Sequence, residues 1–490
     1  MKNKAMIVLS TTALFIPLMT AAALAASGVE RTALPGAGAR YVQTKNLIAG
    51  SAAAPGKMLR VDRTQAQLTI SAWEKNEVSV DATVEVSHSD PEFVKEFLDN
   101  TTMKLEAEAG GLVLRLTSPM DWDRGKTNFF KTIGDALRTG RWNLSYAARI
   151  EIRVPASQSL DVSNHFGNVS VSGVTGRLAL RNESGEVRIE GCGGELKLEN
   201  SFASVRVVDF GGPIDVRNES GEVRAERIAG RTDIRNSFKD VQFSKIGGPL
   251  AVISESAGIA GSDVAGDCRI TSSFKTIDVR GVRGRLEVKG ESSGVTVDDV
   301  SLDAVVESSF KPVKVTNVKG GLRLTSESAA VTAEDIGGDA SIKSSFQSIA
   351  ASRIRGHLTV DGESSAVMAE DIGGAVRVRN SFKNIVLRRT SGSITIAGES
   401  SSVNVEEIKA LPPGSAIDIK TSFNPIQITL PAGIEVQGTA KTEFGKIITD
   451  IPVTLRDSGS AGGRAVSFGT GKGGVTLKLE TSADITIRIK

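Results

Sequence analysis

Acidic residues that recur at a fixed interval are the first feature of this sequence that could do chemistry. Paired carboxylates can bind calcium or, on either side of a sugar, hydrolyse a glycosidic bond. The acids here are Asp263, Asp298, Asp299, Glu334, Asp335, Glu370, Asp371, Glu406 and Glu407. Basic residues recur at equivalent places between them, at Lys245, Arg280, Arg353, Arg388 and Arg389. Since each acid would have a cation as neighbour, we expect solvated ion pairs.

Other groups that could support catalysis or cofactor binding do not cluster in the sequence. The three histidines, His88, His165 and His357, are scattered. No Ser-His-Asp set, metal-spaced cluster, phosphate loop or calcium-binding Gly-Gly-x-Gly-x-Asp nonapeptide is recognisable. The sequence therefore predicts no enzyme activity and no cofactor. With 59 basic against 57 acidic side chains, nucleic acid is also a poor candidate partner.

A repeat accounts for the regular spacing of these charges. Phenylalanine recurs every 36 residues from Phe166 to Phe382, and Glu-Ser pairs recur with the same period from Glu183 to Glu399. Each Glu-Ser pair begins 18 residues after a Ser-Phe or His-Phe pair, so the unit has 18 residues in two alternating forms. Thirteen such units, beginning at His165 and ending with the unit at Ser381, follow one another without insertion or deletion. A repeat of this kind is typical of a stacked array.

The pattern inside one unit predicts its fold. Positions 5, 7, 10, 14 and 16 are apolar, as in Val205, Val207, Phe210, Ile214 and Val216, and glycines cluster near positions 11 to 13. These spacings predict two short strands joined by a turn rather than a pair of helices. We predict an all-β fold, a parallel β-solenoid in which each unit forms one two-strand rung, and we expect right-handed connections.

The phenylalanines at position 2 allow two interpretations. Rings in every second rung, alternating with serine, could interdigitate in a thin core, and this packing interpretation is favoured. Alternatively, the rings could form an exposed row about 10 Å apart that binds a glycan or peptide strand. The residues of this candidate ligand face are Phe202, Phe238, Phe274, Phe310, Phe346 and Phe382.

Other columns have structural interpretations. We expect the position-1 glutamates to pair with the position-3 lysines Lys239, Lys275, Lys311 and Lys383, and the amides of Asn182, Asn200, Asn218 and Asn236 to hydrogen-bond along the axis. Cys192 and Cys268 occupy core positions about four rungs, or roughly 19 Å, apart. They are predicted to be buried free thiols, since a disulfide requires Cα atoms within about 7 Å.

The chain ends suggest export and capping. Lys2 and Lys4, an apolar stretch and Ala23-Leu24-Ala25 predict a signal peptide over 1–25, with an uncleaved anchor as the alternative. No later segment is apolar enough to cross a membrane as a helix. We expect a flexible linker over 26–57, an irregular β-rich region over 58–164, the regular solenoid over 165–421, and further rungs with a cap over 422–490.

Two short helices are predicted in the irregular region. Ser89-Asp90-Pro91-Glu92 is a typical helix start, followed by Phe93, Val94, Phe97 and Leu98 on one face. The second helix would carry Phe129, Phe130, Ile133, Ala136 and Leu137, with Trp122 and Trp142 near its ends. We favour a role in capping the solenoid, and a membrane-surface or partner contact is the alternative.

The chain resembles a family of bacterial exported β-strand-repeat proteins catalogued as putative adhesins of unknown function. The resemblance covers roughly residues 58 to 490. It rests on Leu59-Arg60-Val61 with Ser71-Ala72-Trp73 and Glu77-Val78, on the repeated Ser-Gly-Glu-Val, and on Leu479-Glu480-Thr481 with Ile485-Thr486-Ile487. It implies adhesion or association with the cell envelope and supplies no catalytic residues.

Three functions are compatible with the sequence. The first is a non-enzymatic exported scaffold or adhesin, periplasmic or on the cell surface, that binds a surface glycan or an envelope protein. The second is a polysaccharide-active β-helix enzyme, which would need a carboxylate cluster that breaks the repeat. The third is an accessory protein of envelope stress or signalling.

Overall fold

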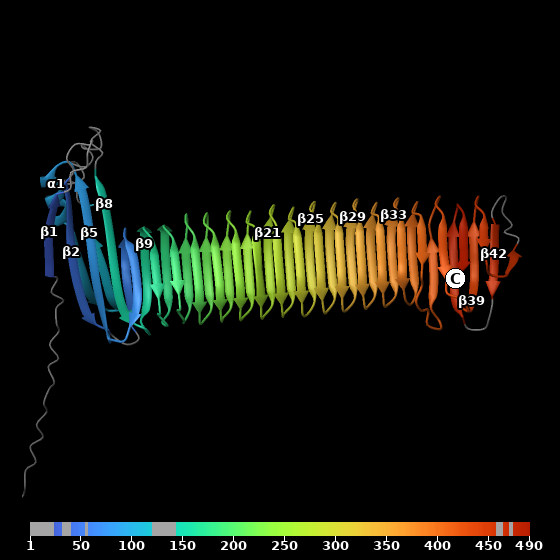
Figure 1. Cartoon of the computed structure of the whole chain (residues 1–490), viewed down its shortest axis with the longest axis horizontal. Helices are drawn as coiled ribbons and strands as arrows, with labels where there is room; N and C mark the ends of the chain where they lie inside the picture. The colour runs from blue at the N-terminus through green and yellow to red at the C-terminus, as the bar shows by residue number, and fades with distance from the viewer. Residues whose placement is uncertain (1–23, 32–40, 54–56, 120–143, 457–463, 470–473) are drawn as a thin grey trace, which may run out of the picture. The chain divides into compact units, whose positions relative to one another are not determined.

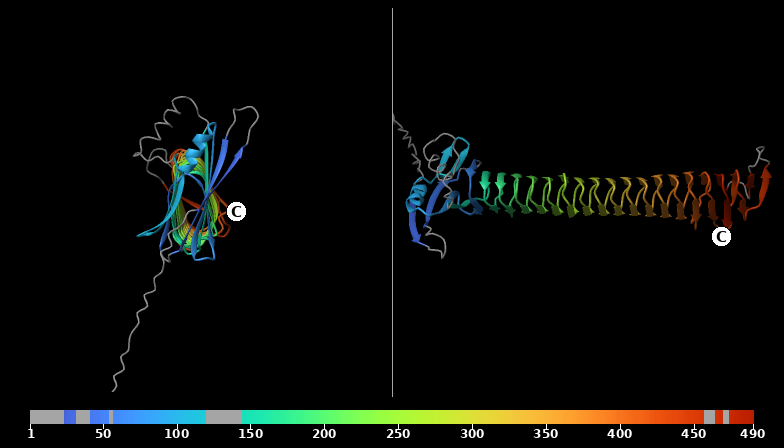
Figure 2. Two further views of the ribbon diagram at one scale, coloured as in Figure 1. Left: turned by 90° about the vertical axis from the view of Figure 1, so that its left-hand side faces the viewer. Right: turned by 90° about the horizontal axis from the view of Figure 1, so that it is seen from above.

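The structure is a computed structural model that describes residues 24–31, 41–53, 57–119, 144–456, 464–469 and 474–490. Contacts between residues divide the chain into two compact units, Met1–Gly167 and Asn168–Lys490. The second unit is a parallel β-solenoid whose strands stack side by side, as Figures 1 and 2 show. This confirms the predicted fold class.

Each rung of the second unit contributes one strand to each of two sheets. The first sheet contains β10 (Val169–Ser172), β12 (Val187–Glu190), β14 (Val205–Phe210), β16 (Val223–Ile228), β18 (Val241–Ile246), β20 (Ile259–Val264), β22 (Ile277–Val282), β24 (Val295–Val300), β26 (Val313–Val318), β28 (Val331–Ile336), β30 (Ile349–Ile354), β32 (Val367–Ile372), β34 (Ile385–Thr390), β36 (Val403–Glu406) and β38 (Ile426–Leu430). The second contains β11 (Leu178–Ser184), β13 (Leu196–Asn200), β15 (Ile214–Asn218), β17 (Thr232–Asn236), β19 (Leu250–Ser254), β21 (Cys268–Ser273), β23 (Leu286–Glu291), β25 (Ala304–Ser309), β27 (Leu322–Glu327), β29 (Ala340–Ser345), β31 (Leu358–Glu363), β33 (Val376–Ser381), β35 (Ile394–Glu399) and β37 (Ala416–Lys420).

Neighbouring strands pair 18 residues apart, so every position stacks on its own equivalent. Val187 of β12 lies opposite Val205 of β14, and Leu196 of β13 lies opposite Ile214 of β15. The predicted register of the repeat is therefore confirmed.

A backbone bulge explains why the apolar spacing within a rung changes from two to three. Position 9 has a left-handed backbone, as at Asp209 with φ 54° and Asp335 with φ 58°. The pairing of β14 with β16 omits this position, passing from Val208–Glu226 directly to Phe210–Ile228. One extra residue in the strand returns the next side chain to the core. Positions 8 and 9 consequently both face outward, which places two neighbouring charges on the surface.

The core contains the alternation of large and small residues that was predicted for the phenylalanine column, but at another position. Phe243 of β18 is buried and lies between Ala225 of β16 and Gly261 of β20. A Cβ atom built on Gly261 would lie 2.3 Å from the Phe243 ring. Where valine occupies this position, as at Val279, the side chain is small enough that the equivalent residues of both neighbouring rungs need not be alanine or glycine.

Polar side chains fill the corner between the two sheets. The Asn182 amide donates to Asn200 Oδ1, and the Asn200 amide donates to Asn218 Oδ1, both at 3.1 Å, which confirms hydrogen bonding along the axis for these three residues. The ladder ends there, because the Asn218 amide donates to the Gly221 carbonyl instead of Asn236. Further along the solenoid, Ser308 Oγ at the end of one rung donates to the Ser293 carbonyl in the corner at the start of that rung, at 2.6 Å. These bonds tie consecutive corners together.

The last rungs do not follow the order of the chain. They are built from β39 (Val436–Thr442), β40 (Ile447–Thr449), β41 (Val453–Arg456), β42 (Arg464–Gly469), β43 (Val475–Thr481) and β44 (Ile485–Ile489). Strand β43 pairs in parallel with both β37 and β39, and β44 pairs with both β38 and β40. The C-terminal strands are therefore inserted between two rungs that precede them in sequence.

The first unit contains two sheets and one helix among its described residues. The sheets are built from β1 (Leu24–Arg31), β2 (Tyr41–Ala52), β5 (Glu77–His88), β8 (Ser145–Pro155) and β4 (Gln67–Trp73), and from β6 (Thr102–Glu108), β7 (Gly111–Thr117), β3 (Met58–Thr64) and β9 (Ser159–Phe166). Helix α1 (Pro91–Asp99) confirms the first predicted helix, and the Asp90 carboxylate caps it by accepting from the Glu92 N–H at 2.9 Å. The second predicted helix lies outside the described residues, as do residues 1–23 of the predicted signal peptide.

The prediction of a flexible linker is wrong for Tyr41–Ala52. These residues form β2, which pairs antiparallel with β5 along its whole length and buries Leu47 and Ala49. The small and polar residues of this segment carry only a weak apolar alternation, and pairing with β5 supplies the backbone hydrogen bonds that hold it. Among the described residues, no helix combines the length and apolar character needed to cross a membrane.

The cysteines are buried and unpaired, as predicted. Cys192 is 4% exposed and Cys268 is 2% exposed. Burial raises the pKa of Cys192 and raises that of Cys268 to about 12, because the thiolate would lose its hydration. Both thiols therefore stay protonated near neutral pH.

We predict that substituting Gly261→Val destabilises the solenoid by about 1–3 kcal/mol, because the new side chain meets the Phe243 ring. The double variant Phe243→Val/Gly261→Val should recover most of this loss, since valine is the ordinary residue at that position. Denaturant unfolding of the full chain measures both, and equal stability of the single variant and the wild type would contradict this packing.

We also predict that neither thiol reacts with an alkylating reagent at about pH 8 in the folded protein, and that both react after unfolding. Mass spectrometry counts the modified residues. Rapid labelling of Cys268 in the folded state would show that its rung is open to solvent.

Candidate functional site

The phenylalanines at position 2 are exposed. Phe238 is the least exposed of the six candidates at 50% and Phe310 the most at 64%. The favoured prediction that these rings interdigitate in the core is therefore wrong. Position 2 lies in the corner beyond the last inward-facing residue of a strand, so its side chain leaves the solenoid instead of entering it.

The backbone of the corner holds each ring outward. From Phe274 on, the phenylalanines have a left-handed backbone, with φ between 62° at Phe310 and 69° at Phe274. The N–H of Lys275 donates to the Ser273 carbonyl at 3.0 Å, and the Phe274 N–H donates to the Glu291 carbonyl of the next rung at 2.8 Å. This conformation is unfavourable for a bulky side chain and is characteristically found at functional sites. These corners thus present their rings on a strained support, whereas Phe202 and Phe238 are exposed without a left-handed backbone.

Serine occupies the equivalent position in the intervening rungs. Ser292 also has a left-handed backbone, with φ 54°, while the next residue, Ser293, is fully buried. Gly290 precedes this corner, and a Cβ atom there would lie 2.9 Å from Ser293 Cβ. The tighter corner leaves no large side chain between two neighbouring rings, so the edge alternates a protruding ring with a recess.

The row continues beyond the six predicted residues. Phe423 is 74% exposed and Phe444 is 84% exposed. The pairing of Ile426 with Ile485, and of Ile485 with Ile447, places Ser482 between these two rings in space. The phenylalanine row of the second unit is therefore Phe202, Phe238, Phe274, Phe310, Phe346, Phe382, Phe423 and Phe444.

Sequence reasoning missed the last two rings because the 36-residue period is lost after Phe382. The Ser-Phe pair at 422–423 was a usable signal, since it repeats the Ser-Phe pairs of earlier rungs. Phe444 had no such signal, because only the insertion of β44 between β38 and β40 gives it the correct place.

Charged residues flank the rings but do not form the predicted ladder. Among the described residues, no ion pair joins the position-1 glutamates from Glu219 to Glu399 to the position-3 lysines. Lys275 instead contacts Asp240 at 3.3 Å, and Lys311 Nζ donates to the Phe274 carbonyl at 2.7 Å. The two columns lie in alternating corners, and the lysine side chains point toward earlier rungs. The glutamates therefore remain exposed beside the row.

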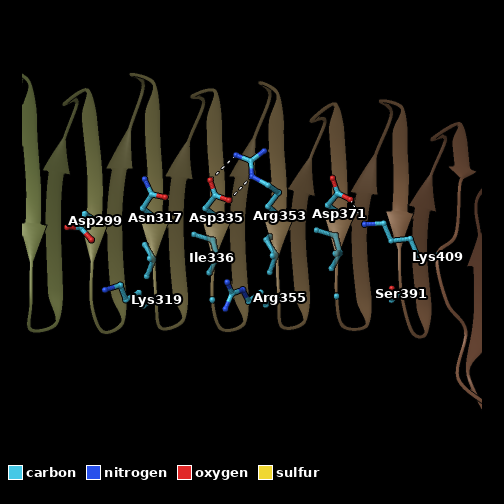
Figure 3. Close-up of a pocket in the computed structure, with 15 residues that line it drawn as sticks. Asp299, Asn317, Lys319, Asp335, Ile336, Arg353, Arg355, Asp371, Ser391 and Lys409 are labelled. Carbon is cyan, nitrogen blue, oxygen red and sulfur yellow. Dashed lines mark hydrogen bonds and ion pairs between the residues drawn. The ribbon is translucent and has the colours of Figure 1, made fainter.

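From Glu334 to Glu407, the acids at positions 8 and 9 lie in the predicted ion pairs with Arg353, Arg388 and Arg389. Among the described residues, Asp263, Asp298 and Asp299 form no such pair with the cations predicted for them. Figure 3 shows the position-9 acids Asp299, Asp335 and Asp371. They line a surface groove of about 990 Å³, together with residues that include Asn317 and Arg353. Arg353 pairs with Asp335 at 2.6 Å and also with Glu334. Arg353 also lowers the pKa of Asp335 by hydrogen bonding to its carboxylate.

The same arrangement repeats in the next rungs. Arg389 Nε lies 3.0 Å from Asp371 Oδ1, and Lys409 Nζ lies 2.6 Å from the same oxygen. Hydrogen bonds from the Asn317 and Thr316 side chains lower the pKa of Asp298. Each of these carboxylates has neighbouring donors within the repeat. Within the part of the chain that the structure describes, no group of three His, Cys, Asp or Glu residues could hold a metal ion.

Comparisons with known proteins give only distant likenesses. No family model matches the chain, and no curated protein matches it. A solved "putative cell adhesion protein" from Clostridium sporogenes is 8% identical, with 90% of this chain and 99% of that chain covered and a TM-score of 0.12. A "putative adhesin" from Parabacteroides merdae is 9% identical, with 74% and 96% covered and a TM-score of 0.14. A "putative lipid binding protein" from Parabacteroides distasonis is 12% identical, with the same coverage and a TM-score of 0.14.

Two of these names agree with the resemblance to adhesin-like proteins drawn from the sequence. The TM-scores are too low for the likenesses to support an argument about function. The candidate site therefore rests on the geometry of the phenylalanine row.

We predict that Phe274→Ser and Phe310→Ser each change the free energy of unfolding by less than about 1 kcal/mol, because the rings are already exposed. The matched core substitution Phe210→Ala should cost about 3–5 kcal/mol, since that ring is 1% exposed. Thermal and denaturant unfolding compare the three variants. A large loss on removing Phe274 or Phe310 would show that the row is part of the packing.

Proposed function

We propose that this protein is an exported, non-enzymatic scaffold of the adhesin type, and that the phenylalanine row is the surface by which it binds its partner. The partner is a surface glycan or an envelope protein. The pattern of Lys2, Lys4 and Ala23-Leu24-Ala25 supports export to the periplasm or the cell surface.

The observation that carries this proposal is the maintenance of the ring-and-serine alternation where the chain order changes. Phe423, Ser482 and Phe444 occupy consecutive rungs although Ser482 comes last in the sequence. Packing does not require this arrangement, because Phe444 is 84% exposed. A row of exposed rings on strained corners is unfavourable for an isolated soluble protein, whereas a binding surface uses both features.

The geometry of the acids supports a binding role over glycan hydrolysis. A glycosidase needs one protonated and one ionised carboxyl group on either side of the sugar. Asp335 and Asp371 instead contact Arg353 and Arg389, and Arg353 favours the ionised form of the Asp335 carboxyl group.

The test is co-sedimentation of the exported protein with isolated bacterial envelopes, peptidoglycan and surface polysaccharide. The row variant Phe274→Ser/Phe310→Ser/Phe346→Ser should reduce binding by roughly tenfold or more, since aromatic anchors dominate binding energies. Leu302→Ser is the matched control, because Leu302 is 49% exposed at the opposite corner. Equal binding by the row variant and the wild type would contradict the proposed surface.

A further inference from the structure

The partner of the phenylalanine row must match its period. The rings stand in every second rung, so their spacing is about 10 Å. The corners of the second unit follow a line along the solenoid (Figures 1 and 2). A partner that contacts several rings at once needs a repeat of the same length. A second copy of this chain has that repeat along its whole row.

Two such rows can interlock. Each ring is followed by a recess at a serine corner, such as Ser292 between Phe274 and Phe310. If the rings of one copy enter the recesses of the other, rings from alternate copies lie about 5 Å apart along the interface. This distance is within the range that offset-stacked aromatic pairs prefer, about 4.5–7 Å between centroids.

The charges beside the row are also complementary between two copies whose rings interlock in this way. The corner that carries Phe274 also carries Lys275, and the corner of the following rung carries Glu291. A two-fold axis perpendicular to the solenoid, passing between adjacent rungs, places each ring corner of one copy opposite a serine corner of the other. Every lysine corner then faces a glutamate corner. The operation that interlocks the rings therefore also brings the lysines of one copy next to the exposed glutamates of the other.

The exposed area is sufficient for a stable contact. Six rings that are 50% to 64% exposed present on the order of 700 Å² per copy, if a whole phenylalanine side chain presents about 200 Å². The flanking lysine, serine and glutamate side chains add to this area. A standard protein interface buries about 800 Å² per partner.

We infer that the phenylalanine rows of two copies of this chain pair antiparallel, so that the envelope protein bound by the row is a second copy. This inference rests on the proposed function of the row as a binding surface. Pairing would bury the rings that the strained corners hold outward, and it would join two solenoids side by side into a wider scaffold.

The experiment is sedimentation equilibrium of the exported chain and its variants over a wide range of concentration. The wild type and Leu302→Ser should be dimers. The row variant Phe274→Ser/Phe310→Ser/Phe346→Ser should have a dissociation constant raised roughly a hundredfold or more, since it removes three anchors from each copy. Circular dichroism confirms that each variant is folded.

A charge exchange tests the antiparallel register. Lys275→Glu/Lys311→Glu should weaken the dimer about tenfold, because like charges then face each other across the interface. With the two-fold axis between the rung of Glu291 and that of Phe310, Lys311 faces Glu291 and Lys275 faces Glu327. Adding Glu291→Lys/Glu327→Lys to the same chain then restores opposite charges and should restore the dimer. Failure of this exchange to restore the affinity would overturn the register.

The outcomes separate this inference from the proposed function. A wild type that stays monomeric, or a dimer that survives in the row variant, overturns the pairing of rows. If the row variant is then still defective in binding envelopes or isolated glycans, the proposed function stands with a glycan or another envelope protein as the partner. If the row variant binds normally and its oligomeric state is unchanged, both the inference and the proposed function fail.

Discussion

The in-register stacking of 18-residue rungs is the constraint on which the rest of this structure depends. Adjacent parallel strands lie about 4.8 Å apart, so every residue has its own equivalents as nearest neighbours. A column of identical large rings or identical charges would be crowded or repulsive. The chain alternates residue types in both cases. Phe243 lies between Ala225 and Gly261 in the core, and Asp335 lies next to Arg353 on the surface.

Because the rungs stack in register, a backbone conformation that recurs at one position of the rung produces an extended surface along the solenoid. A bulge at position 9 directs two side chains outward in each rung, and repetition makes a continuous band of ion pairs along one face. The corner at position 2 places one ring outward in every second rung, with a left-handed backbone from Phe274 to Phe423, and repetition makes a row. The band satisfies its own charges, whereas the row leaves apolar surface in water. This difference is the physical reason to assign binding to the row and stability to the band.

Pairing between two rows would remove from water the apolar surface that a single row exposes. Exposed aromatic rings at regular intervals favour uncontrolled association, and a partner with a matching period limits that association to one geometry. The alternating lysine and glutamate corners add selectivity, because a shift of the partner by one rung would bring like charges together. A glycan with a suitable repeat could occupy the same surface, and its binding would compete with the contact between copies.

The sequence by itself determined the solenoid, the 18-residue rung, the inward positions, the ion pairs and the buried thiols. These features follow from periodicity, which strand stacking converts directly into contacts. It also determined helix α1, through the Asp90 cap. Only the tertiary structure decided that the phenylalanine column faces solvent, because an apolar residue in a corner can turn either way and the apolar pattern of the sequence does not distinguish the two directions. Only the tertiary structure decided that Tyr41–Ala52 is a strand and that Ser482 lies between Phe423 and Phe444, because both depend on pairing between segments far apart in the chain.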